Sequence, residues 1–232
     1  STSKPSPAAS LAVPLLQDTS VPVFNVILPE LLHASEPKDI YLPNADNAVT
    51  STASPKKAIE LSERAHLYAL YEAKRYTEVI AELAPRLEAL RDDPRLLGQH
   101  IPEVILLIRI YSNQAQGDLA LEWCERALQA DTVNPILQYL KAEIKSAFND
   151  VPGAIDSLKK ALFLDPNFIA ALYLYGQLET KAGHRNSAAK AFQRALKLLE
   201  TYPADSPLIG TEELVASQVK AHVLSSLRES NG

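Results

Sequence analysis

A small residue recurs at a fixed interval in the second half of this chain. Ala120, Ala154 and Ala188 are equally spaced, and three neighbouring columns repeat the same interval. These columns are Cys124/Leu158/Phe192, Ala127/Ala161/Ala195 and Leu128/Leu162/Leu196. Within each copy the first three positions are spaced i, i+4, i+7, which places them on one face of an α-helix. The spacing therefore predicts a tandem array of one helical unit.

The interval of about 34 residues and its columns resemble the tetratricopeptide (TPR) repeat, a unit of two antiparallel helices. Small residues where two helices cross let the backbones approach, and a larger apolar residue one turn away fills the gap beside them. The first helix of each unit should carry a complementary stripe, and Leu172, Tyr175 and Gly176 in 169–182 fit it. In 101–115 the stripe is Val104, Leu107, Ile108 and Tyr111. We therefore predict an all-α TPR superhelix of four helix pairs, with a C-terminal capping helix and an irregular N-terminal extension.

The outer repeats are less regular. Segment 61–90 carries one stripe (Leu67, Leu70, Tyr71) and then a second (Val79, Leu83, Leu87). Because Val79 precedes Ala120 by more than the repeat interval, we expect a seven-residue insertion around Arg91–His100. In the third repeat Lys141 and Lys145 fall near inward positions, so we expect its first helix to be rotated by about one residue.

The end of the chain predicts a helix that covers the last repeat. After Tyr202-Pro203, residues 211–228 offer Thr211 as an N-cap, Glu212 and Glu213 for the first turn, and a stripe of valines. The stripe is Val215, Val219 and Val223. We expect three parts: an extension over 1–57, the TPR array over 58–200, and a turn with the capping helix over 201–232.

The extension over 1–57 differs in composition from the rest of the chain. Residues 1–20 are rich in Ser, Pro and Ala, as linkers are, whereas 21–32 (VPVFNVILPELL) hold eight large apolar residues. So apolar a segment should dock on the solenoid, and we expect a cap on the edge of the first repeat. The alternative is the groove, where Phe24, Ile27 and Leu28 would imitate a partner peptide. Because the chain begins with Ser1 and contains no methionine, we expect it to be a fragment whose upstream domain is missing.

No catalytic motif is present in the sequence. The seven glycines form no G-x-G, and the five histidines have no metal-ligand spacing, so we expect no enzyme activity, cofactor or metal. Cys124 lies on the packed face and should be a structural thiol, whereas Trp123 is either an exposed recognition residue or a packing residue. A net charge of −5 argues against nucleic acid, no apolar run is long enough to enter a membrane, and a single cysteine suits the cytoplasm.

The concave groove is the only functional surface that the sequence indicates, and it suits a protein or peptide partner. The first helix of each TPR pair lines it. The groove residues that we predict are Arg64, Tyr68, Tyr71, Arg109, Asn113, Tyr139, Glu143, Tyr173, Gln177 and Lys181. Tyrosine and arginine commonly anchor peptides, although any one of these residues is equally well an ordinary solenoid side chain. The TPRs that bind chaperone C-termini carry lysine and asparagine where Arg64 and Tyr68 stand, which disfavours that ligand class.

A narrower family resemblance lies near the end of the chain. Residues 161–168 (ALFLDPNF), Ala195–Leu199, Pro203–Pro207 and the helix from Thr211 resemble the C-terminal TPR region of CheR-type chemotaxis receptor methyltransferases. Cys124–Leu128 and Asn134-Pro135 resemble that family's preceding repeats. The resemblance implies a docking module of an S-adenosylmethionine-dependent enzyme, with a chemoreceptor or another chemosensory protein as partner. The alternative is a general TPR scaffold or adaptor of a secretion or envelope-assembly complex.

Overall fold

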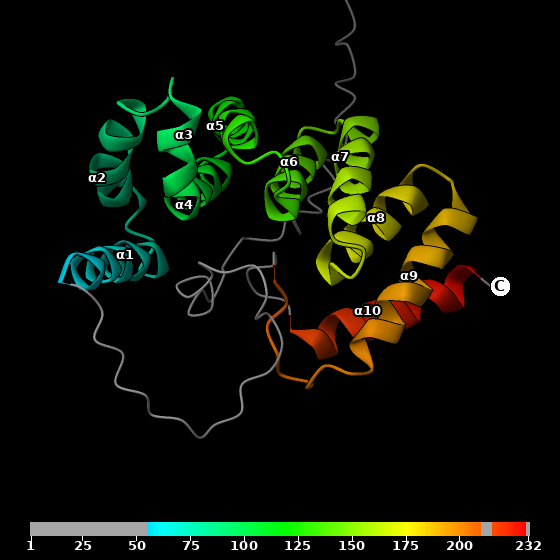
Figure 1. Cartoon of the computed structure of the whole chain (residues 1–232). Helices are drawn as coiled ribbons and strands as arrows, with labels where there is room; N and C mark the ends of the chain where they lie inside the picture. Colours follow the sequence, from blue (N-terminus) through cyan, green and yellow to red (C-terminus); the bar gives the residue numbers. More distant parts are fainter. Residues whose placement is uncertain (1–54, 210–214, 231–232) are drawn as a thin grey trace, which may run out of the picture.

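The computed structural model describes residues 55–209 and 215–230, and in them the chain is an all-α TPR superhelix (Figure 1). The helix pairs are α1 (Pro55–Glu72) with α2 (Tyr76–Glu88), α4 (Ile101–Asn113) with α5 (Gly117–Ala130), α6 (Pro135–Ala147) with α7 (Val151–Leu164), and α8 (Ile169–Lys181) with α9 (Arg185–Leu199). The predicted fold class is confirmed for these residues. The expected extension, including 21–32, lies outside the described residues apart from the start of α1.

The expected insertion before the second pair contains a short helix of its own. Helix α3 (Pro94–Leu97) continues into a 3₁₀ turn at Gly98–His100, between α2 and α4. The carboxylate of Asp93 caps α3 by accepting hydrogen bonds from the backbone N–H groups of Arg95 and Leu96. The insertion therefore adds a compact turn without interrupting the stacking of the pairs.

The turn inside each pair has the same backbone geometry. A residue with positive φ follows the first helix at Lys74 (57°), Ala115 (57°), Asn149 (62°) and Gly183 (83°). The next N–H donates to the carbonyl five positions earlier, as in Arg75 to Leu70 at 2.9 Å and His184 to Glu179 at 2.8 Å. This is a Schellman motif, which ends a helix by satisfying its last carbonyl groups. From Ala115 onward it recurs at the same interval as the alanine columns, so it repeats with the array.

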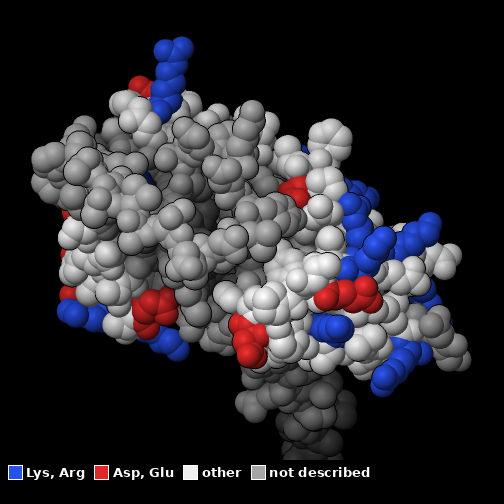
Figure 2. All heavy atoms as spheres, turned by 60° about the horizontal axis from the view of Figure 1, so that its bottom comes forward, with Lys and Arg blue, Asp and Glu red and all other residues white. Residues whose placement is uncertain are grey.

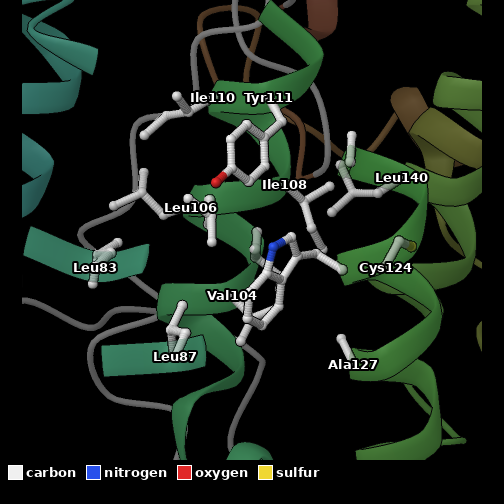
Figure 3. Close-up of a cluster of buried hydrophobic side chains, with 14 of the residues drawn as sticks. Leu83, Leu87, Val104, Leu106, Ile108, Ile110, Tyr111, Cys124, Ala127 and Leu140 are labelled. Atoms are coloured by element: carbon white, nitrogen blue, oxygen red, sulfur yellow. The ribbon is translucent and has the colours of Figure 1, made fainter. Parts of the chain in front are cut away.

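The alanine columns lie where the helices cross. Ala120, Ala154 and Ala188 are at most 1% exposed, and the second column of alanines is fully buried. Figure 3 shows Leu83 and Leu87 of α2 and Cys124 and Ala127 of α5 lying on either side of α4. One apolar core thus runs from α1 to α6, and further clusters continue it through α8 to α10.

A glycine allows a close contact between the helices of the fourth pair. A Cβ at Gly176 of α8 would lie 2.4 Å from the ring of Phe192 of α9, far inside van der Waals contact. Phe192 is buried and belongs to the repeated columns. The sequence stripe that included Gly176 is therefore a packing requirement, since no side chain fits at this position.

The burial pattern of the third pair does not confirm the rotation that we expected from its lysines. Helix α6 buries Leu137, Tyr139, Ala142 and Ile144, and α8 buries the residues at the equivalent positions, which are Ala171, Tyr173, Gly176 and Leu178. Lys141 reaches Glu125 at 3.0 Å and Lys145 reaches Asp150 at 3.1 Å, so both ammonium groups stay at the edge of the helix. Pairing with these acidic residues keeps the two charges out of the core without a change of register.

The capping helix is shorter than we predicted. Helix α10 (Ala216–Ser230) begins at Ala216, and the expected cap at Thr211 with its first-turn glutamates falls in 210–214, outside the described residues. Val215 does not belong to the helix, because it forms an antiparallel bridge with Pro207 and its N–H donates to the side chain of Gln218. Val219 and Val223 are fully buried against α9, as the stripe predicted.

The repeated turns generate a matched pair of stability predictions. Ala115→Gly should raise the free energy of unfolding by about 0.5–1 kcal/mol, because an exposed alanine with positive φ is strained. Gly183→Ala should lower it by about 1–2 kcal/mol, and it does so through the backbone alone because an added Cβ meets nothing within 4 Å. Urea unfolding followed by circular dichroism measures both, and shifts of the same sign would contradict the turn geometry.

Candidate binding groove

The first helices of the pairs, α1, α4, α6 and α8, carry a row of polar and aromatic side chains. The row begins between α1 and α4, where Arg64 Nε donates to Glu103 Oε1 at 2.6 Å. Tyr68, one turn after Arg64, is half-buried beside them. The pKa of Tyr68 is raised to about 12, first by burial and then by the charge of Glu103, while Arg109 and Arg64 partly offset both effects. The Tyr68 hydroxyl therefore stays a neutral donor at physiological pH.

The carboxylate of Glu103 is only half satisfied by the described residues. Its side chain is 9% exposed, and its Oε2 is buried without a hydrogen-bond donor among them. Glu103 lies in a shallow hollow, and the other residues of its lining are Arg64, Leu67, Tyr68, Pro102 and Leu106. A buried carboxylate oxygen without a donor is costly, so this hollow suits a ligand that brings an N–H or O–H group.

The row continues across α4 and α6. A second shallow hollow lies there, and its lining contains Arg109, Ser112, Leu140, Glu143 and Ile144. The Tyr139 hydroxyl donates to Glu143 Oε1 at 2.6 Å, and the Tyr139 ring packs 5.1 Å from that of Phe168. Cationic, anionic and hydroxyl groups are thus presented side by side on neighbouring first helices.

Asn113 connects the row to the turn of the first pair. Its Nδ2 lies 3.3 Å from the hydroxyls of both Tyr71 and Tyr76, which accept from it. The Tyr71 and Tyr76 rings pack 5.4 Å apart, and Tyr71 is almost completely buried. Tyr71 therefore packs in the core and offers only its hydroxyl to this network.

The row ends between α8 and the capping helix. The Tyr173 hydroxyl is 2.8 Å from His222 Nδ1, and the Tyr173 ring packs against Phe192. Burial raises the pKa of Tyr173 above its ordinary value. Farther along α8, Gln177 is exposed, and Lys181 Nζ donates to Asn149 at 2.9 Å in the turn of the third pair. Gln177 and Lys181 thus lie toward the rim rather than in the row.

The ten groove residues that we predicted differ in burial. Four are buried: Tyr71, Arg109, Tyr139 and Tyr173. Four are half-buried: Arg64, Tyr68, Asn113 and Glu143. The prediction missed Glu103 and His222, which complete the two ends of the row. Glu103 had a sequence signal, because it and Arg109 are the only charged residues in the apolar helix 101–113. His222 had none, since its partner Tyr173 is far away in the sequence.

Cys124 and Trp123 are both packing residues. Trp123 is 5% exposed, so of its two interpretations the structure supports packing and contradicts exposed recognition. The Cys124 thiol is fully buried and donates to the Leu137 carbonyl at 3.2 Å. Burial raises its pKa to about 12, which is the opposite of what a nucleophile requires.

Two further observations concern 55–209 and 215–230 only. In these ranges no three His, Cys, Asp or Glu side chains come together as a metal site. None of the helices described there is both long and apolar enough to cross a membrane.

The outer surface has a different charge distribution from the row. Figure 2 shows basic side chains gathered toward the end of the molecule that α7 to α10 form, with acidic ones between them. Helix α9 contains no acidic residue. It contributes four exposed cations, which are Arg185, Lys190, Arg194 and Lys197. This surface provides charge-matched control positions that lie outside the row.

Comparison with known proteins supports the fold. No protein-family model and no curated protein gives a significant match to this chain. Among solved structures, PcrH in complex with the chaperone binding region of PopD matches with a TM-score of 0.50 and 13% identity, over 57% of this chain and 92% of that one. A T3SS complex from Aeromonas hydrophila matches with a TM-score of 0.51 and 15% identity, over 63% of this chain and 95% of that one. MamA matches with a TM-score of 0.50 and 15% identity, over 71% of this chain and 92% of that one. At these identities the likeness concerns the TPR solenoid alone.

The buried thiol predicts very slow modification. At pH 8 the folded protein should react with Ellman's reagent at least about 10³-fold more slowly than the unfolded chain, because a pKa near 12 rather than 9 leaves about a thousandth as much thiolate. Cys124 is the only cysteine, so the measurement follows one site. Reaction of the folded protein at a rate similar to that in guanidinium would show that Cys124 is accessible after all.

Proposed function

We propose that this chain is a protein-interaction module that binds an extended peptide segment of a partner along the concave row of α1, α4, α6 and α8. The observation that carries the proposal is Glu103, whose buried Oε2 has no donor among the described residues. An extended peptide has backbone N–H groups that it cannot satisfy itself, and such a group would complete the carboxylate.

The rest of the row supports the same kind of ligand. Tyr68 and Arg64 offer donors beside Glu103, and Leu67, Pro102 and Leu106 give the hollow an apolar lining. Large aromatic and guanidinium side chains supply much of the affinity in peptide grooves. The arrangement therefore combines apolar contact area with fixed polar groups, as binding sites do.

The resemblance to CheR-type methyltransferases supports a narrower proposal. According to this narrower proposal, the module docks an upstream S-adenosylmethionine-dependent enzyme on a chemoreceptor or another chemosensory protein. The module would then work in the cytoplasm. The second candidate is an adaptor of a secretion or envelope-assembly complex. Its support is that PcrH and the T3SS complex from Aeromonas hydrophila share the fold.

A charge-matched pair of variants tests the groove. Peptides selected from a displayed library against the protein should bind about 10-fold more weakly or worse to Arg64→Glu, which places a second carboxylate beside Glu103. Lys190→Glu makes the same change of charge at an exposed site on α9 and should leave binding within about twofold. Titration by fluorescence anisotropy measures both affinities, and circular dichroism confirms that both variants are folded.

An equal loss of peptide affinity in the two variants, or a loss of affinity only in Lys190→Glu, would place the binding surface outside the row. The narrower proposal needs a separate experiment, in which a purified chemoreceptor cytoplasmic domain is titrated against the protein. Binding that Arg64→Glu weakens would support the chemosensory partner. No binding, with library peptides still bound, would favour the adaptor.

A further inference from the structure

We propose that residues 21–32 of this chain occupy the concave row in cis, so that a partner must displace them. The inference rests on the proposed function, in which the row is the binding surface. The segment VPVFNVILPELL contains eight large apolar residues and only one charged residue, Glu30. Free in water it would expose a large apolar surface, and its bounding prolines favour an extended backbone rather than a helix.

The burial pattern of the inner helices indicates that the row is a covered surface. Helix α5 exposes residues along its whole length, namely Asp118, Leu119, Glu122, Glu125 and Gln129. Helix α4 exposes none of its residues, and α6 exposes none before Ala147. Arg109 and Tyr139, which the repeat places toward the groove, are 3% and 4% exposed. An inner face open to water should instead show exposed side chains once per helical turn.

The chemistry of the row suits this segment. Its apolar side chains can lie on Leu106, Tyr68 and Pro102, which take part in the first hollow. Its backbone N–H groups lack partners in an extended chain, whereas Glu103 Oε2 lacks a donor among the described residues. Each side therefore supplies the group that the other lacks, and Glu30 is the only charged side chain that the segment brings.

The connection to the solenoid allows this position. Residues 33–54 join the segment to α1, which begins at Pro55 and is the first helix of the row. A connection of that length spans at most about 80 Å when fully extended. The segment can therefore reach the row from its N-terminal end without displacing any helix.

The edge of the first repeat, where we expect a cap from the sequence alone, is a poor docking place for an apolar segment. From Ser62 to Leu90 no large apolar side chain is exposed. His66 Nε2 lies 3.6 Å from a carboxylate oxygen of Glu82, and Arg86 forms an ion pair with Glu63 at 3.7 Å, so polar contacts join α1 and α2. An apolar cap would bury these polar groups without gaining apolar contact.

The test measures binding of a fluorescein-labelled peptide of residues 21–32. It compares the unaltered chain with a full-length chain in which 21–32 are replaced by glycine and serine residues. We expect the peptide to bind the replaced chain at least about 10-fold more tightly, because its site there is vacant. Arg64→Glu in the replaced chain should weaken binding at least about 10-fold, whereas Lys190→Glu should change it less than about twofold.

Equal affinity for both chains, or no effect of Arg64→Glu, would overturn the inference. The inference would also be overturned if His66→Glu in the replaced chain abolished peptide binding and Arg64→Glu did not, because the peptide would then lie at the edge of the first repeat. Library peptides separate the inference from the proposed function. If they bind the row of the replaced chain and the 21–32 peptide does not, only the inference fails. If neither binds, the proposed function fails as well. Circular dichroism confirms that the replaced chain is helical.

Discussion

Close contact between helices at small residues determines the rest of this structure. Ala120, Ala154 and Ala188 are buried at equivalent crossings, and each allows a second helix to approach the first. Because the same contact recurs in the second, third and fourth pairs, these pairs stack in the same way, and their first helices come to lie beside one another. The polar row exists because this stacking brings residues from α1, α4, α6 and α8 to one side of the molecule.

The row places several charged and hydroxyl groups in partly buried positions. Glu103 with Arg64, Tyr139 with Glu143, and Tyr173 with His222 are linked by hydrogen bonds of 2.6–2.8 Å. Such groups lose favourable hydration, so they need partners to remain buried. A solenoid that only had to be stable would place apolar residues here, and our proposal accounts for the polar ones by a ligand that would complete the network.

Much of the fold could be predicted from the sequence, because packing leaves a local periodic signal. The alanine columns gave three of the four pairs, and the apolar stripes of 61–90 gave the first. The rotation that we expected for α6 from Lys141 and Lys145 is not confirmed, because α6 and α8 bury residues at equivalent positions. The start of α10 could not be predicted, because the bridge between Pro207 and Val215 depends on a contact between separate segments. For the candidate groove, the repeat indicates which face of each first helix a residue lies on. It does not indicate the burial of Arg109 or the pairing of Tyr173 with His222, because both depend on neighbours that no short-range pattern encodes.

Hydroxyl-radical footprinting tests most directly whether the concave row is a covered binding surface. The measurement compares side-chain oxidation in the unaltered chain and in the chain whose residues 21–32 are replaced. Our account predicts that oxidation of Tyr68 and Tyr139 rises severalfold on replacement. Phe163, which is 85% exposed on α7, should be oxidised equally in both chains. Unchanged oxidation of the two tyrosines would contradict the account.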